Sequence, residues 1–384
     1  MPVMSDPYLY VDSPAALESL CTRLRGQPWV AVDTEFMRER TYYPELCLVQ
    51  VATDEVVACV DPLALPSLQP LLEVLLDPKT LKVLHAARQD LEIFYNLTGA
   101  VPAPVFDTQV VARFLGHPDQ SGYGAVVQSI LGISLDKSHA RTDWMRRPLP
   151  PAALEYAADD VRHLRHLYKK LAAELVSRGR GGWAGPELKA LTDEKLYKPD
   201  PENAWQRIRG IQRMKPKAAA LAKPLAAWRE RTAIAENRPR QWILKDETLM
   251  DLAKQQPADL ASLAAVRGVG DSLAKRHGAE LLKILKQGGD APSERERVPA
   301  ALSTRQDALV DALTAIVRLK AAGGQVSAAS LANRSELERL VRGERELEIL
   351  KDWRLDMAGQ ALLDFMAGKQ SLAAGEGGLD ILPR

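Results

Sequence analysis

Four short apolar segments, rich in β-branched residues, lie within residues 29–87, and no convincing strand pattern follows residue 185. Segments of this kind, bounded by turn-forming residues, are typical of β-strands. The first three follow one another closely enough to form hairpins, so we expect a mixed sheet rather than a wholly parallel one. The four predicted strands cover residues 29–36, 46–53, 55–62 and 81–87.

Helical patterns flank these segments and then take over the chain. Residues 68–78 carry leucines at helical spacing, residues 88–99 end at a glycine, and residues 151–179 form one long uninterrupted pattern. This order predicts an α/β domain in which helices flank the sheet. Beyond residue 185, periodic segments rich in Ala, Leu, Lys, Arg and Glu are broken by Pro and Gly, which predicts an all-helical second half.

The helical half contains two stretches with a similar plan, residues 235–270 and 328–359. We interpret them as two divergent copies of one small module. A stretch rich in Gly, Pro, Ser and charges, residues 286–299, separates them without any periodicity. The predicted organisation is an α/β domain over 1–200, a first helical module over 201–290, a linker over 291–299, a second module over 300–370 and a flexible tail over 371–384.

Composition excludes several classes of protein. Of the 384 residues, 46% are hydrophobic and 26% are charged, and no apolar run approaches the length that spans a bilayer, so a membrane protein is not expected. The first residues lack the basic and apolar regions of a signal peptide. Cys21, Cys47 and Cys59 show no CxxC spacing, which predicts neither a disulfide framework nor a zinc site. We therefore expect a protein of the reducing cytoplasm.

An acid pair ends the first predicted strand. Because successive side chains of a strand point to opposite faces, Asp33 and Glu35 share one face. Two carboxylates that close repel each other unless a cation, usually a metal, compensates them. A strand end that faces solvent is the alternative. Asp90 lies just beyond a predicted strand, in the first turn of a helix, where the helix dipole by itself favours an acid.

A further acid lies on the long predicted helix. Tyr156 precedes Asp160 by four residues, so the two share one helix face. Asp159 points about 100° away from that face, which favours Asp160 as the functional acid. Taken alone, the Tyr156–Asp160 pair could equally be a pair at the surface or core edge. If the acids converge, their oxygen ligands suit Mg²⁺ or Mn²⁺, and two such ions about 4 Å apart can promote phosphoryl transfer.

Other polar residues are expected to support the fold. Asp107 is predicted to form hydrogen bonds near a strand end, and His85 to be a packed or loop-ordering residue. His163 and His166 lie three residues apart, but no Cys or Glu is arranged around them to complete a metal site. The glycines of residues 267–272 could offer backbone N–H groups to a phosphate, or simply form a helix–helix turn.

Basic residues gather at the start of the helical half, although the net charge of the chain is only +1. Between residues 205 and 245, eleven Lys and Arg residues are opposed by Glu230 and Glu236. This stretch predicts a surface that grips a polyanion, while an ordinary solvated face is the alternative. The candidate contact residues are Arg207, Arg209, Arg213, Lys215, Lys217, Arg238, Arg240 and Lys245.

Three motifs resemble those of a known superfamily. The stretches VDTEF (32–36), HAARQD (85–90) and YAADDV (156–161) are similar to the exonuclease motifs of the DEDD superfamily of 3′-5′ exonucleases, in the subclass with Tyr in the third motif. The likeness is greatest to the ribonuclease D family and runs from about residue 8 to 178. The helical half resembles HRDC domains, of which that family carries two. The second copy has WRLDMAG (353–359) where the first has VRGVGDS (266–272).

The resemblance implies a ribonuclease H-like exonuclease domain followed by two small helical HRDC bundles. It also implies that a two-metal site holds Mg²⁺ or Mn²⁺, with Asp33 bridging both ions, and that Tyr156 positions the attacking water. The implied metal ligands are Asp33, Glu35, Asp90 and Asp160. The expected substrate is RNA with a single-stranded 3′ end, such as a tRNA precursor, trimmed by a monomer to nucleoside 5′-monophosphates. An exonuclease acting on DNA and a catalytically silent RNA-binding adaptor are the alternatives, and the chain lacks the GxxxxGK[ST] loop of an NTP-driven motor.

Overall fold

The computed structural model describes residues 7–136, 142–288 and 301–384, and it divides into two compact units. The first unit contains the residues up to Glu35, then Leu46–Leu196, and the C-terminal part of the chain. The second contains residues 36–45 and the segment that begins at Tyr197. The predicted linker, residues 291–299, lies outside the described residues.

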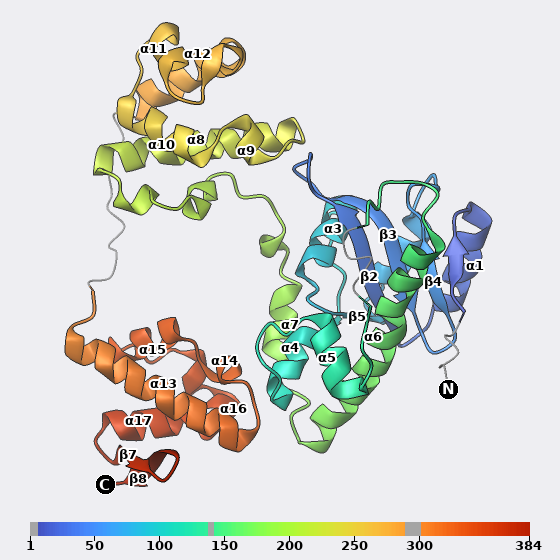
Figure 1. Cartoon of the computed structure of the whole chain (residues 1–384), viewed down its shortest axis with the longest axis vertical. Coiled ribbons are helices and arrows are strands. Elements are labelled where there is room, and N and C mark those ends of the chain that lie inside the picture. The colour runs from blue at the N-terminus through green and yellow to red at the C-terminus, as the bar shows by residue number, and fades with distance from the viewer. Residues whose placement is uncertain (1–6, 137–141, 289–300) are drawn as a thin grey trace. The chain divides into compact units, whose positions relative to one another are not determined.

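The first unit is built around a six-stranded sheet with the strand order β1-β4-β3-β2-β5-β6. Its strands β2, β3, β4 and β5 are labelled in Figure 1. Strand β1 runs parallel to β4, and β2, β5 and β6 run parallel to one another, whereas β3 and β4 are antiparallel. The predicted mixed sheet is therefore confirmed. The strands are β1 (Leu9–Val11), β2 (Trp29–Met37), β3 (Glu45–Ala52), β4 (Val57–Val60), β5 (Leu81–Leu84) and β6 (Val105–Asp107).

Within this sheet, the two strands that the sequence does not predict, β1 and β6, are three residues each. Three residues are too few to show an alternating pattern, so no periodic signal marks them. Both are held by parallel pairing to a longer or more buried neighbour, β1 to β4 and β6 to β5. Tertiary pairing rather than local pattern decides their conformation.

Helices cover the sheet, and the longest of them, α6, packs against β4 and β5 (Figure 1). Its buried residues recur at helical spacing, for example Ala157, Val161 and Leu164, which is the pattern of a helix with one face on a core. The helices of this part are α1 (Pro14–Leu24), α2 (Gln69–Leu76), α3 (Arg88–Thr98), α4 (Thr108–Ala112), α5 (Tyr123–Leu131), α6 (Pro151–Ser177) and α7 (Gly185–Leu191), with 3₁₀ turns η1 (Arg113–Leu115) and η2 (Glu194–Leu196).

The C-terminal part of the same unit is a helical bundle with its own apolar core. It comprises α13 (Thr304–Gly324), α14 (Ala328–Leu331), α15 (Arg334–Val341), the 3₁₀ turn η5 (Glu348–Leu350), α16 (Asp352–Arg354), a π-helical turn η6 (Leu355–Gly359) and α17 (Gln360–Met366).

A β-hairpin follows this bundle, where the sequence predicts a flexible tail and no strand. Strands β7 (Gln370–Gly375) and β8 (Gly378–Pro383) pair in antiparallel register. Their turn contains Gly377 at φ +85°, a conformation that favours glycine. Leu372 and Ile381 oppose each other across the hairpin and pack on the core of the bundle. This packing orders the segment, and composition alone does not reveal it.

The second unit is a separate helical bundle. Its elements are η3 (Ala204–Arg207), η4 (Ile211–Arg213), α8 (Pro216–Ala235), α9 (Arg240–Ile243), α10 (Asp246–Gln255), α11 (Leu260–Ala265) and α12 (Gly270–Gly288). Residues 36–45, from the last residues of β2 to the first residue of β3, also belong to this unit. The Tyr42 hydroxyl donates to Glu230 over 2.6 Å, and its backbone N–H donates to the Asn237 side chain over 3.1 Å.

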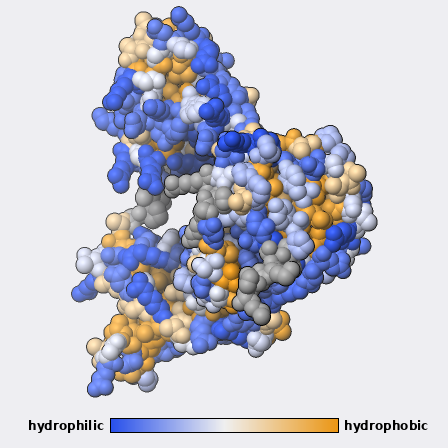
Figure 2. Space-filling model, turned by 45° about the vertical axis from the view of Figure 1, so that its right-hand side comes forward, coloured by the Kyte–Doolittle hydropathy of each residue, from blue (hydrophilic) through white to orange (hydrophobic). Residues whose placement is uncertain are grey.

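The visible molecular surface is largely hydrophilic, with hydrophobic patches interspersed among polar residues (Figure 2). Among the described residues, no helix combines the length and the apolar character that crossing a membrane requires.

Candidate active site

Three carboxylates from two elements converge beside the second half of β2, which continues past the acid pair to Met37. Each of Asp33, Glu35 and Asp160 offers one oxygen atom, and these three atoms all lie within 4.8 Å of one another. The residues before the acid pair, Val30 to Val32, are fully buried, so the strand is anchored in the core before its carboxylates emerge. Asp160 of α6 approaches the face that Asp33 and Glu35 share, and all three side chains are half-buried.

Helix α6 contributes the third acid of this cluster and a tyrosine one turn before it. Tyr156 and Asp160 line a common cavity of about 240 Å³. The ring of Trp144 lies 6.5 Å from the Tyr156 ring, centroid to centroid. The neighbouring Asp159 pairs instead with Arg162, so of the two adjacent aspartates only Asp160 joins the cluster.

Asp90 lies at the margin of this cluster. It is 7% exposed, in the first turn of α3, and it accepts a hydrogen bond of 2.5 Å from the Thr34 hydroxyl. It is not among the three acids whose ligand atoms lie within 4.8 Å of one another. It is still close enough to Asp33 for that charge to raise its pKa. Thr34, which sequence reasoning missed, thus ties α3 to the strand of the acid pair.

The carboxylates of the site are hard to ionise together. Burial raises the pKa of Asp33 to about 6. Burial and then the charges of Asp33, Asp160 and Asp90 raise the pKa of Glu35 to about 9. Burial, followed by the charge of Asp33, also raises the pKa values of Asp90 and Asp160 well above their usual range. The cluster therefore holds protons at neutral pH unless a cation neutralises it.

This donor set fits divalent cations. Among the described residues, this cluster brings the ligand atoms of three acids close enough to one another to hold a metal ion. All its donors are carboxylate oxygens, which suit hard ions such as Mg²⁺ and Mn²⁺. A bound cation would also relieve the repulsion that raises the pKa values, because its charge favours the ionised acids.

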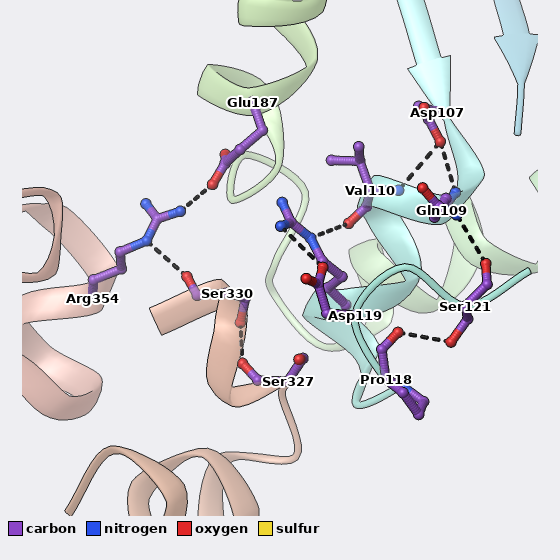
Figure 3. Close-up of polar contacts among 11 residues, drawn as sticks. Asp107, Gln109, Val110, Pro118, Asp119, Ser121, Glu187, Ser327, Ser330 and Arg354 are labelled. Atoms are coloured by element: carbon purple, nitrogen blue, oxygen red, sulfur yellow. Dashed lines mark hydrogen bonds and ion pairs between the residues drawn. The ribbon is translucent and has the colours of Figure 1, made fainter. Parts of the chain in front are cut away.

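Asp107 fixes the backbone next to the site through hydrogen bonds. Its buried carboxylate accepts hydrogen bonds from the N–H groups of Ala86 and Ala87, at 3.1 and 2.8 Å, just before α3. It also caps α4 by accepting from Gln109 and Val110, at 2.8 and 3.2 Å (Figure 3). One side chain therefore fixes the starts of two helices, one of which carries Asp90. The structural role predicted for Asp107 is confirmed.

A hydrogen-bonded layer connects α5 to α6. The Tyr123 hydroxyl donates to the backbone carbonyl of Asp160. The His85 ring lies 5.3 Å from the Tyr123 ring and donates to the carbonyl of Ser121 over 3.1 Å. His85 is thus a loop-ordering residue, as predicted. The sequence offers no signal for the role of Tyr123, because its partner is a backbone atom 37 residues later.

The two histidines of α6 do not form a metal site within the described part of the chain. His163 lies 3.9 Å from Asp159, and neither it nor His166 belongs to a metal-type cluster among the described residues.

Gly268 has φ +87°, and a Cβ there would come within 2.4 Å of the Thr248 hydroxyl. The glycines of this stretch therefore serve a tight connection between α11 and α12, which is the turn that the sequence allowed.

The basic stretch in the second unit is partly neutralised. Buried Glu230 pairs with Arg240 at 2.9 Å and with Arg207 at 3.6 Å, and Arg238 pairs with Glu236 at 3.1 Å. The other five candidate contact residues are exposed, namely Arg209, Arg213, Lys215, Lys217 and Lys245. Exposed basic residues remain, although they are fewer than the residue count suggests.

Two family models match separate parts of the chain. Residues 8–176 match the family model for 3′-5′ exonucleases, and residues 218–285 match the model for the HRDC domain. The chain is similar to ribonuclease D of Granulibacter bethesdensis, with 42% identity over 92% of this chain and 91% of the relative. It is also similar to ribonuclease D of Sphingobium indicum, with 40% identity over 94% and 95%.

Solved structures agree. Escherichia coli RNase D, described as an exoribonuclease involved in structured RNA processing, superimposes with a TM-score of 0.79 and 31% identity over 94% of this chain and 99% of that chain. The catalytic core of RRP6 from Trypanosoma brucei shares the fold, with a TM-score of 0.59 and 22% identity over 75% and 81%. The fold is thus a ribonuclease H-like exonuclease core with an HRDC domain and further C-terminal helices. The chain belongs to the ribonuclease D family of 3′-5′ exoribonucleases.

Proposed function

We propose that this protein removes nucleotides from the 3′ ends of structured RNA, with tRNA precursors as its substrates, by a two-metal-ion hydrolysis. The observation that carries the proposal is the convergence of Asp33, Glu35 and Asp160 within 4.8 Å, one helical turn from Tyr156. Asp90, tied to Thr34 at the margin of the cluster, completes the proposed ligand set.

The four acids would hold two divalent ions, Mg²⁺ or Mn²⁺. When bound, such ions supply a hydroxide at neutral pH and stabilise the charge on the departing 3′ oxygen. The hydroxide oxygen forms a bond to the terminal phosphorus, the bond from phosphorus to the 3′ oxygen breaks, and that oxygen takes up a proton. The products are a nucleoside 5′-monophosphate and an RNA one residue shorter.

Tyr156 serves as an orienting group in this scheme. Burial and then the charge of Asp160 raise the pKa of its phenol above the usual range. It therefore keeps its proton at neutral pH and acts as a hydrogen-bond partner of the attacking water, not as a base.

We further propose that the exposed basic residues of the second unit contact the RNA backbone. Phosphate contacts position a substrate without reading its sequence, so binding should weaken steeply with salt. We interpret residues 300–370 as a second, divergent HRDC domain, because the plan of that bundle repeats the first. We also propose a monomer that acts in the cytoplasm, which the three free, buried cysteines support.

A direct test uses RNA and DNA of matched sequence, each labelled at the 5′ end and carrying a single-stranded 3′ tail. The purified chain is incubated with each substrate in Mg²⁺, Mn²⁺ or EDTA. We expect a metal-dependent ladder that shortens from the 3′ end of the RNA, together with release of 5′-monophosphates.

The matched controls are Asp33→Asn, which should abolish the ladder, and Asp77→Asn, an exchange at a half-buried aspartate beyond α2 that should preserve it. Equal or faster loss of DNA would favour a DNA exonuclease. Intact RNA that stays bound in every condition would favour a silent adaptor.

A further inference from the structure

An aromatic stack joins the C-terminal bundle to the exonuclease fold inside the first unit. Trp353 of α16 stacks on Trp183, with ring centroids 4.2 Å apart and planes inclined by 3°. The ring of Phe114, in η1, meets Trp353 edge-on at 5.7 Å. Large aromatic surfaces contribute strongly to packing between elements, so this face of the bundle is specifically engaged.

The residue after Trp353 adds a buried ion pair to the same contact. Arg354 is 8% exposed and pairs with Glu187 of α7 (Figure 3). Its Nε–H also donates to the carbonyl of Ser330 over 2.9 Å. A buried guanidinium is tolerated only where such partners are present, and removal of one partner leaves an uncompensated charge.

Backbone groups of the bundle bind the turn η1 directly. The Ser327 N–H donates to the carbonyl of Arg113 over 2.8 Å. Arg180 donates to the carbonyl of Phe114 on one side and to those of Gly324 and Gln325 on the other, at 2.7, 2.7 and 3.0 Å. Because the acceptors are main-chain atoms, these bonds constrain the path of the chain itself.

The segment that contains η1 also contacts residues that support the active site. Turn η1 continues α4, whose cap is Asp107, the side chain that also fixes the start of the Asp90 helix. The loop after η1 ends at Ser121, whose carbonyl accepts from Gln109 over 3.1 Å and from His85 (Figure 3). The segment from Asp107 to Tyr123 thus has the C-terminal bundle on one side and the supports of Asp90 and Asp160 on the other.

This contact explains a divergence between the two helical modules. Trp353 and Arg354 open the stretch WRLDMAG, which replaces the glycine-rich VRGVGDS of the first module. In the first module that stretch is a tight turn beside Thr248. In the second it carries the two side chains that contact the exonuclease fold.

We propose that the C-terminal bundle is a brace for the catalytic fold, and that Trp353 and Arg354 are positioning residues for the exonuclease reaction. The proposal rests on the proposed function for its catalytic readout. The bundle holds the segment 107–123 and thereby keeps Asp90 and Asp160 in register with the acid pair of β2. Its contribution lies in turnover and not in gripping RNA.

The test is a charge reversal with rescue in the full-length protein. Arg354→Glu places like charges together, and the double variant Arg354→Glu with Glu187→Arg restores an opposite pair. Arg334→Glu is the matched control, because Arg334 lies in the same bundle but forms only exposed ion pairs, with Asp307, Asp311 and Glu338. Each variant is assayed for kcat and KM on tailed RNA and for amide hydrogen exchange in residues 107–123.

We expect Arg354→Glu to lower kcat about tenfold, to change KM less than twofold, and to accelerate exchange in residues 107–123. The double variant should recover most of both losses, and Arg334→Glu should resemble the wild type. A raised KM with unchanged kcat would overturn the proposal and make the bundle an RNA-binding element. Unchanged exchange in Arg354→Glu would also overturn it. Because exchange needs no substrate, absence of exonuclease activity in the wild type would refute the proposed function alone.

Discussion

Metal binding at the Asp33, Glu35 and Asp160 cluster should release protons and should tighten as the pH rises. Carboxylate ligands must be ionised to bind a metal, whereas burial and mutual repulsion raise the pKa of Glu35 to about 9 and burial raises that of Asp33 to about 6. The experiment therefore varies the pH across the range in which the metal-free acids still hold protons.

The magnitude follows from these values. At pH 7 a group with a pKa of about 9 is roughly 99% protonated and one with a pKa of about 6 roughly 10%, so these two acids release about one proton per site. Asp160 and Asp90 add to this number, because their pKa values are also raised. For each proton released, the apparent affinity for the metal should rise about tenfold per pH unit.

The stability of the metal-free protein should fall as the pH rises, whereas the affinity for the metal should increase. The folded-state pKa of Glu35 lies above its ordinary value, so folding takes up a proton between about pH 4.5 and pH 9. Its contribution to stability is fully present below about pH 4.5 and is lost as the pH rises through about 9. The metal-free chain should thus unfold more readily at pH 9 than at pH 6, and added Mn²⁺ should reverse this trend.

Titration calorimetry with Mn²⁺, in two buffers of different ionisation enthalpy at pH 7, measures the protons released. Glu35→Gln should release about one proton fewer than the wild type. Glu73→Gln, an exchange at an exposed position of α2, should match the wild type. Equal heats in the two buffers, or an affinity that is constant from pH 6 to pH 8, would refute the account of a protonated cluster.

Three further outcomes are expected. Asp160→Asn should lower kcat at least 100-fold, whereas Asp159→Asn, in the adjacent residue that pairs with Arg162, should lower it less than fivefold in the same ladder assay. Asp107→Asn should cost about 1–3 kcal/mol of unfolding free energy in a urea titration, because an amide cannot accept all four backbone N–H groups that the carboxylate now accepts. Replacing Lys215 and Lys217 together by Gln should flatten the salt dependence of RNA binding, measured by fluorescence anisotropy, by a slope of about 1–2.

The elements that the sequence predicts well are those with a local signal. Four strands have runs of β-branched and apolar residues, and all four are present with their ends moved by a few residues. The long helix 151–179 corresponds to α6, Pro151–Ser177. Helical periodicity also separates Asp160 from Asp159, because a rotation of about 100° per residue follows from helix geometry alone.

The features that the sequence does not reveal depend on partners far along the chain. Thr34 contacts Asp90, and Tyr123 contacts the backbone of Asp160, across 56 and 37 residues. Neither contact leaves a spacing or a composition that could be recognised in one sequence. The same holds for residues 36–45, because Tyr42 packs in the core of the second unit and donates a hydrogen bond to Glu230, which lies 188 residues later.

The two helical modules show why a repeated pattern does not by itself predict a role. The shared plan predicts two divergent copies of one helical module, but what each copy does depends on its side chains and on their partners. In the second module the stretch WRLDMAG (353–359) begins with an aromatic stack and a buried arginine, and their partners Trp183 and Glu187 lie in or beside the glycine-rich boundary that follows α6. A large aromatic side chain in a glycine-rich boundary is easily dismissed as part of a linker. Its stacking on Trp353 makes the boundary part of a packed contact. Under the brace proposed above, the divergence of the second module is a change of partner and not a loss of function.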